Sequence, residues 1–155
     1  MKKVLNDIGG GFKEPIKALQ IGGPLGGVIP IAEAEKLNLD FQEFTAAGFM
    51  LGHASIVSIP KDFPMVEYIH HLFEFTAEES CGKCFPGRLG SYRGKEMFDQ
   101  LKSKTAKIPL KVLNDLLLTM KNGCLCALCG AIPTPIMNIL KYFGDEMKDD
   151  MVKEN

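Results

Sequence analysis

The second half of the chain carries apolar residues at helical spacing. Four segments show the pattern, and they run through Met65–Phe73, Met97–Leu101, Ile108–Met120 and Ile136–Met147. Apolar residues three and four positions apart share one face of a helix. Proline stands near the start of three of these segments, where its missing N–H is tolerated. Because the connections are short, we predict an antiparallel four-helix bundle.

The first part of the chain shows a different pattern, in which short apolar runs alternate with glycine. Ile16–Ile21 and Ile56–Ile59 are typical of strands, and the glycines of residues 22–27 indicate a turn. These features predict a small sheet. The chain is therefore expected to be an α+β protein with two domains, residues 1–60 and residues 61–155.

Composition narrows the class of protein. The formal net charge of the 155 residues is −1, whereas a nucleic-acid-binding protein usually has a basic excess. No apolar run approaches the roughly 20 residues that span a membrane, and the N-terminal segment has no apolar core of signal-peptide length. We therefore expect a cytoplasmic protein without a nucleic-acid partner and without direct membrane insertion, with a place at the periphery of a membrane complex left open.

Five cysteines fall into two groups. Cys81 and Cys84 form a C-x-x-C, and Cys124, Cys126 and Cys129 form a C-x-C-x-x-C. An odd number without an export signal argues against a disulfide framework and favours a reduced metal site. Both groups are expected in loops at one end of the helical bundle. Thiolates suit a [4Fe–4S] cluster and also suit zinc, so the spacing alone leaves both metals open.

The residues around the first cysteine pair narrow this choice. Glu79–Gly90 reads E-S-C-G-K-C-F-P-G-R-L-G. This segment resembles the cluster-binding segment of the 51-kDa-type flavoprotein subunit of NADH:quinone oxidoreductase (complex I). The related diaphorase subunits of hydrogenases and formate dehydrogenases have a similar segment. Leu125–Leu128, followed by Pro133–Pro135, is similar to the second cysteine loop of that family. Leu19–Gly27 is similar to the start of its soluble-ligand-binding β-grasp domain. The resemblance covers nearly the whole chain.

This resemblance implies an electron-transfer module with one [4Fe–4S] cluster, in which the family's ligands are the cysteines of C-x-x-C-x-x-C and one cysteine of the later loop. The third position of the first motif is Gly87 here, which offers no ligand atom. We expect Cys129 to replace it, because Cys129 repeats the C-x-x-C spacing with Cys126, and Cys124 is the alternative. The expected metal ligands are Cys81, Cys84, Cys126 and Cys129.

Other outcomes stay open at this point. If no substitute ligand reaches the cluster, a [3Fe–4S] cluster, an exogenous ligand or loss of the cluster follows. The alternative function is a structural or docking fragment of such a complex, with the cluster lost or replaced by zinc. Gly82, Gly123 and Gly130 are expected to let backbone N–H groups approach the sulfurs. Lys83 and Arg88 flank the first cysteine pair and would balance negative charge.

The family also carries a domain for FMN and NAD ahead of its β-grasp region, and this chain begins at that boundary. We therefore expect the chain to bind neither FMN nor NAD, to have no catalytic residues of its own, and to work with other flavin or iron–sulfur subunits of a redox complex. Gly22–Gly27 is not expected to bind a dinucleotide, because Pro24 interrupts it and no βαβ unit surrounds it.

Overall fold

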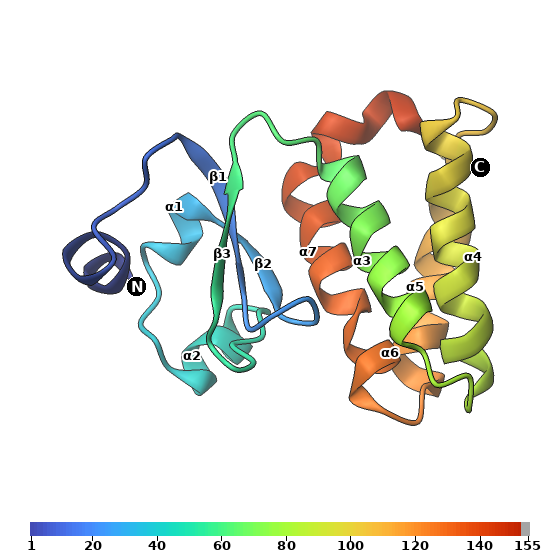
Figure 1. The fold of residues 1–155 in the computed structure, drawn as a ribbon, viewed down its shortest axis with the longest axis horizontal. Coiled ribbons are helices and arrows are strands. Elements are labelled where there is room, and N and C mark those ends of the chain that lie inside the picture. Colours follow the sequence, from blue (N-terminus) through green and yellow to red (C-terminus); the bar gives the residue numbers. More distant parts are fainter. Residues whose placement is uncertain (153–155) are drawn as a thin grey trace. The chain divides into compact units, whose positions relative to one another are not determined.

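The computed structural model describes residues 1–152. The chain divides into two compact units, one formed by Met1–Phe63 and one that begins at Pro64 (Figure 1). A three-stranded sheet lies in the first unit, and long helices make up most of the second. The predicted α+β class is therefore confirmed.

The first unit is built around an antiparallel sheet in the order β2-β1-β3. Its strands are β1 (Ile16–Ile21), β2 (Gly27–Pro30) and β3 (Ile56–Pro60), so the two predicted strands are confirmed. The central strand β1 is buried at four consecutive positions, which explains why its apolar residues alternate imperfectly. Short helical segments complete the unit: a π-helical turn at Val4–Ile8, α1 (Ile31–Ala34) and α2 (Phe41–Ala46).

The glycines between β1 and β2 form a tight turn. Gly22 has a φ of +94°, and a Cβ at this position would lie 2.5 Å from the carbonyl oxygen of Leu51. Gly52 lies close to Gly22, because a Cβ built on Gly52 would lie 2.6 Å from the carbonyl oxygen of Gly22. The segment thus joins two antiparallel strands, whereas a dinucleotide fingerprint joins a strand to a helix.

Among the residues that the structure describes, the second unit contains four longer α-helices and one short α-helix. Its helices are α3 (Met65–Glu79), α4 (Phe85–Lys102), α5 (Leu110–Gly123), α6 (Ala127–Ala131) and α7 (Pro133–Phe143). Helix α4 packs against α3 and α5, and α7 packs against the same two helices, so the four longer helices enclose a common core (Figure 1). The side chains at the centre are fully buried and apolar; they include Ile69, Leu72, Phe73, Phe98, Leu113, Leu117, Ile136 and Ile139.

Helix α4 is much longer than the sequence pattern predicted. The apolar period indicated only Met97–Leu101, whereas the helix begins at Phe85. The buried positions in its first half are three glycines and a serine: Gly87, Gly90, Ser91 and Gly94. At these positions the buried atoms belong to the backbone and to small side chains. A search for large apolar residues at helical spacing therefore does not detect them. The prediction was therefore wrong about where this helix starts.

The buried glycines let the neighbouring helices approach α4 closely. A Cβ at Gly94 would overlap the ring of Phe73 on α3, and a Cβ at Gly90 would lie 2.9 Å from Cγ of Met120 on α5. Phe73 also packs against Phe98, with 5.8 Å between the ring centroids. Large side chains from α3 and α5 therefore fill the space that α4 leaves free.

The end of the described chain is ordered by packing. Helix α7 ends at Phe143, and a 3₁₀ helix over Gly144–Asp150 continues the chain. Met147 in this segment is fully buried. Met151–Val152 then pairs in parallel with Ile108–Pro109. The predicted single helix through Met147 is therefore wrong beyond Phe143; residues 153–155 lie outside the described residues.

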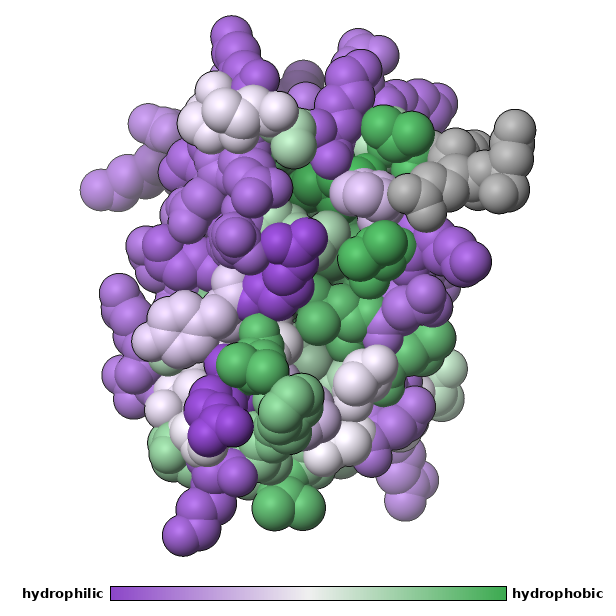
Figure 2. Space-filling view, turned by 90° about the vertical axis from the view of Figure 1, so that its right-hand side faces the viewer, coloured by the Kyte–Doolittle hydropathy of each residue, from purple (hydrophilic) through white to green (hydrophobic). Residues whose placement is uncertain are grey.

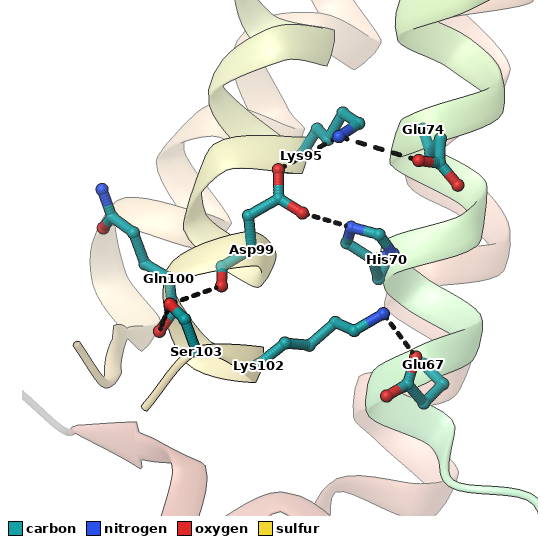
Figure 3. A network of polar contacts seen from close by, with 8 residues as sticks. All are labelled: Glu67, His70, Glu74, Lys95, Asp99, Gln100, Lys102 and Ser103. Atoms are coloured by element: carbon teal, nitrogen blue, oxygen red, sulfur yellow. Dashed lines mark hydrogen bonds and ion pairs between the residues drawn. The ribbon is translucent and has the colours of Figure 1, made fainter. Parts of the chain in front are cut away.

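Polar contacts also join α3 to α4 on the side of the unit shown in Figure 3. The inter-helix pairs are His70–Asp99 (2.6 Å), Lys95–Glu74 (3.7 Å) and Lys102–Glu67 (2.8 Å). His70 is buried, and its Nε2 meets Oδ1 of Asp99, while Lys95 donates to Oδ2 of the same carboxylate. The contacts with His70 and Lys95 hold the pKa of Asp99 below its usual range.

No helix among residues 1–152 is both long enough and apolar enough to cross a membrane.

Replacing Gly94 by alanine is expected to destabilise the second unit. The added methyl group would overlap the ring of Phe73, which is fully buried. Overpacking of this kind costs about 1–3 kcal/mol, and urea unfolding followed by circular dichroism measures it. Gly144→Ala is the matched control, because a Cβ there meets nothing within 4 Å. Equal losses in both variants would contradict this account of α4.

Asp99→Asn is expected to lower the free energy of unfolding at pH 7, by less than about 1 kcal/mol because Asp99 is half-exposed to solvent. A lowered carboxyl pKa stabilises the fold above the unfolded value of about 3.9, and that contribution is lost as pH falls through the lower folded value. The difference between wild type and variant should therefore shrink from pH 7 to pH 3 in urea titrations. A pH-independent difference would show that the charge of Asp99 contributes nothing.

Candidate metal centre

One cysteine group lies where α3 is joined to α4, and the other lies where α5 is joined to α6 and within α6. Cys81 lies in the loop that joins α3 to α4, and Cys84 is the residue directly before α4. Cys124 and Cys126 lie between α5 and α6. Cys129 was expected in a loop, but it belongs to α6; a helix this short gives no recognisable apolar period.

Gly87 marks the point where the two groups meet. It lies in the first turn of α4, and a Cβ built on it would lie 2.8 Å from the sulfur of Cys84 and 2.9 Å from the sulfur of Cys129. The side chain of any larger residue at position 87 would therefore point into the space that these two sulfurs occupy. The sulfur of Cys129 thus lies beside the position that the Cβ of a larger residue at position 87 would occupy.

Backbone N–H groups surround the sulfur of Cys84. The amides of Leu125 and Gly87 are its main hydrogen-bond donors, and they lower the pKa of this thiol. Gly87 contributes its amide because the first turn of α4 has backbone N–H groups without partners inside the helix. Hydrogen bonds of this kind also stabilise a thiolate that is bound to iron.

The five cysteines differ in how deeply they are buried. Cys81 and Cys126 are exposed, Cys84 and Cys124 are half-buried, and Cys129 is buried. Burial and the nearby thiols of Cys84 and Cys129 raise the pKa of Cys124 to about 12. Burial also raises the pKa of Cys129, and a hydrogen bond with the side chain of Ser80 partly offsets this effect. Four thiols therefore influence one another, those of Cys84, Cys124, Cys126 and Cys129.

Among the glycines near the cysteines, Gly123 has a close packing contact that the sequence did not reveal. A Cβ at Gly123 would lie 3.1 Å from Cγ of Pro86, and a Cβ at Gly130 would lie 3.7 Å from Cβ of Cys124. Gly82 has a φ of +72°, which lets the Cys81–Cys84 loop turn. The amides that approach Cys84 come instead from Leu125 and Gly87, and only the fold could identify Leu125 because any residue type except proline has a backbone N–H.

Basic side chains accompany the first cysteine pair. Lys83 and Arg88 are both exposed, and the guanidinium of Arg88 lies 6.0 Å from the centre of the Phe85 ring. A site with several thiolates accumulates negative charge, which nearby cations stabilise.

The donor set fits an iron–sulfur cluster in its chemistry. Among residues 1–152, no three His, Cys, Asp or Glu side chains converge in a way that could hold a single metal ion. A [4Fe–4S] cluster takes one thiolate on each of four irons, so its ligand sulfurs are spread around the cluster and do not meet at one point. Soft sulfur donors from two groups, with backbone N–H groups directed at Cys84, have the character that such a cluster requires.

Comparison with known proteins supports this chemistry. The family model described as "NADH-ubiquinone oxidoreductase-F iron-sulfur binding region" matches residues 67–150. The NADP-reducing hydrogenase subunit HndC of Solidesulfovibrio fructosivorans is 33% identical over 149 residues, which are 94% of this chain and 30% of that protein. The F-type subunit of NADH-quinone oxidoreductase from Streptomyces coelicolor is 32% identical over 148 residues, which are 94% of this chain and 33% of that protein.

A solved structure shares the fold. It is the NAD⁺-reducing [NiFe]-hydrogenase in the H₂-reduced state, which matches with a TM-score of 0.81 at 20% identity, over 97% of this chain and 26% of that chain. This chain thus spans about a third or less of the length of the relatives it matches.

The matched region covers more than half of the sequence and contains all five cysteines. The resemblance drawn from the Glu79–Gly90 segment is therefore confirmed, and this chain belongs to the family of the NADH-ubiquinone oxidoreductase-F iron–sulfur binding region.

Proposed function

We propose that this chain is an electron-transfer module that carries one [4Fe–4S] cluster, as part of a redox assembly of the NADH dehydrogenase or hydrogenase type. The family match supports the iron–sulfur chemistry, and one observation supports this particular site. The sulfurs of Cys84 and Cys129 lie where a side chain at Gly87 would project, 2.8 and 2.9 Å from its Cβ position. Two sulfurs therefore lie beside residue 87 although this residue is glycine.

The proposed ligands are Cys81, Cys84, Cys126 and Cys129. Cys129 is preferred over Cys124 as the replacement for residue 87, because its sulfur shares the space beside Gly87 with the sulfur of Cys84. Cys124 stands nearby as the alternative. A [3Fe–4S] cluster remains the expected form if only three of these thiolates reach iron.

A bound cluster of this type accepts and releases single electrons. The chain's own residues would control how readily this happens. The amides of Leu125 and Gly87 donate hydrogen bonds to the sulfur of Cys84, which favours the more negative, reduced form. Burial of Cys129 keeps water away from one side of the site. The cations of Lys83 and Arg88 counter part of the negative charge that the thiolates bring.

The remaining expectations form part of the same proposal. Residues 1–60 form a β-grasp domain and residues 61–155 an antiparallel four-helix bundle, by resemblance to the family. FMN and NAD bind to another part of the assembly, which passes electrons to the cluster of this chain, and a partner's iron–sulfur centre receives them. The assembly works in the cytoplasm or at the periphery of a membrane complex.

Anaerobic purification with assays of iron and acid-labile sulfide tests the proposal. We expect about four irons and four sulfides per chain, and an EPR signal that appears on reduction with dithionite. Cys129→Ser should lose most of the bound iron, whereas Cys124→Ser should retain it. The double variant Gly87→Cys/Cys129→Ala should recover the cluster, because alanine removes the sulfur that crowds a side chain at position 87 and the new thiol replaces it.

The same measurements define the results that would contradict the proposal. One zinc per chain without sulfide would support a structural or docking role. Three irons with a signal in the oxidised state would show that no fourth ligand reaches the cluster. Loss of iron in Cys124→Ser but not in Cys129→Ser would exchange the roles of the two cysteines. Circular dichroism of each variant would separate loss of the cluster from loss of the fold.

A further inference from the structure

Ser80 lies between the two cysteine groups. It is the residue directly after α3 and directly before Cys81, and its extended backbone (φ −67°, ψ 122°) ends the helix. Its hydroxyl donates a hydrogen bond to the sulfur of Cys129 on α6, and its Oγ accepts a longer one, of 3.4 Å, from the amide of Gly82. A hydroxyl can donate and accept at the same time. One side chain therefore connects the Cys81–Cys84 loop to α6.

The sulfur of Cys129 depends on protein donors more than the other sulfurs do. Cys81 and Cys126 are exposed and Cys84 is half-buried, whereas Cys129 is only 2% exposed. Figure 2 shows the α4 and α5 side of Figure 1, which is covered by apolar as well as polar side chains. A buried group that carries negative charge is strongly destabilised unless the protein replaces the hydrogen bonds of water. A ligand sulfur at position 129 therefore needs hydrogen-bond donors from its own chain.

Two side chains donate to Cys129, and Ser80 is the stronger donor. The other is the thiol of Cys124, which also forms a hydrogen bond with the sulfur of Cys84. A thiol is a weak donor with a single hydrogen, so it cannot fully serve both sulfurs. Cys84 in addition receives hydrogen bonds from two backbone amides. The hydroxyl of Ser80 therefore provides the main hydrogen bond to Cys129.

We propose that Ser80 is a positioning residue of the metal centre, whose hydroxyl holds the sulfur of Cys129 beside Gly87 and stabilises it as a ligand. Ser80 does not bind iron itself, because it acts through Cys129. The inference rests on the proposed function, since it concerns the ligand that replaces residue 87. A hydrogen bond to a ligand sulfur favours the reduced cluster, whose negative charge is larger. Loss of the hydroxyl should therefore make the cluster harder to reduce.

A purely structural role is the alternative, because the hydroxyl also contacts the amide of Gly82 and so supports the Cys81–Cys84 loop. Loss of that contact alone would weaken the loop and leave the ease of reduction of a bound cluster unchanged. The reduction potential therefore separates the two roles. A second measurement on the metal-free chain tests whether Ser80 and Cys129 interact at all.

The first measurement is the reduction potential of the anaerobically purified full chain, from a dithionite titration followed by EPR. We expect Ser80→Ala to lower the ratio of reduced to oxidised cluster about tenfold at a fixed potential, a shift of about 59 mV for one electron. The variant should also lose iron to a chelator about tenfold faster. Ser80→Thr keeps the hydroxyl and should behave as the wild type does.

Ser103→Ala is the matched control for this measurement. Ser103 likewise follows directly on a helix, and its hydroxyl donates to the carbonyl oxygen of Asp99. It lies at the end of α4 opposite Cys84, and the 18 residues of this helix span about 27 Å. Its loss should change neither the potential nor the release of iron.

The second measurement needs no cluster. Urea unfolding of the reduced, metal-free chain is compared for the wild type, Ser80→Ala, Cys129→Ala and the double variant. We expect Ser80→Ala to raise the unfolding equilibrium constant about fivefold more in the wild type than in the Cys129→Ala background, because only the wild type has the sulfur acceptor. The contact with Gly82 is present in both backgrounds, so its loss cancels in this comparison.

Three results would overturn the proposal. The first is an equal potential in the wild type and in Ser80→Ala, and the second is the same shift in Ser80→Thr as in Ser80→Ala. The third is an equal effect of Ser80→Ala in both backgrounds of the unfolding comparison. A wild type that binds neither iron nor sulfide would overturn the proposed function as well, whereas an unchanged potential in a chain with a cluster would overturn only the role of Ser80. The two failures are therefore distinguishable.

Discussion

The close approach of α4 to its neighbours is the constraint on which the second unit depends. Phe73 from α3 and Met120 from α5 fill the space beside Gly94 and Gly90. Because protein interiors are packed without free space, these contacts fix the position of α4 along both neighbours. The same row of small residues continues to Gly87, where the space is filled by two sulfurs. Helix packing and site geometry therefore have one physical origin.

This origin explains why the sequence predicted some elements and missed others. Large apolar side chains revealed α3 and α5, and short apolar runs revealed β1 and β3. The first half of α4 is buried through glycine and serine, so its period does not stand out among apolar positions. The pairing of Met151–Val152 with Ile108–Pro109 involves few residues far apart in the sequence, and no local pattern indicates it.

Some features of the candidate site could likewise be predicted from the sequence, and others could not. Spacing and the family resemblance were enough to predict which cysteines bind metal and to favour Cys129 as the substitute for position 87, because both depend on residue types close together in the sequence. The place of Cys129 within α6 and the amide of Leu125 at Cys84 depend on how α5 and α6 meet α4. Contacts between elements that are distant along the chain do not follow from the sequence around either one.

The position of Cys129 within α6 determines how the sulfurs of the candidate site are brought together. Three cysteines spaced within one loop can gather metal while the chain is still extended, but here the sulfurs of Cys84 and Cys129 face each other only after α4, α5 and α6 have come together. Bringing two distant segments of an unfolded chain together costs conformational entropy. In the folded protein the packing of the helices has already offset this cost. A metal centre that uses both sulfurs would therefore depend on the packing of these helices to bring its ligands together.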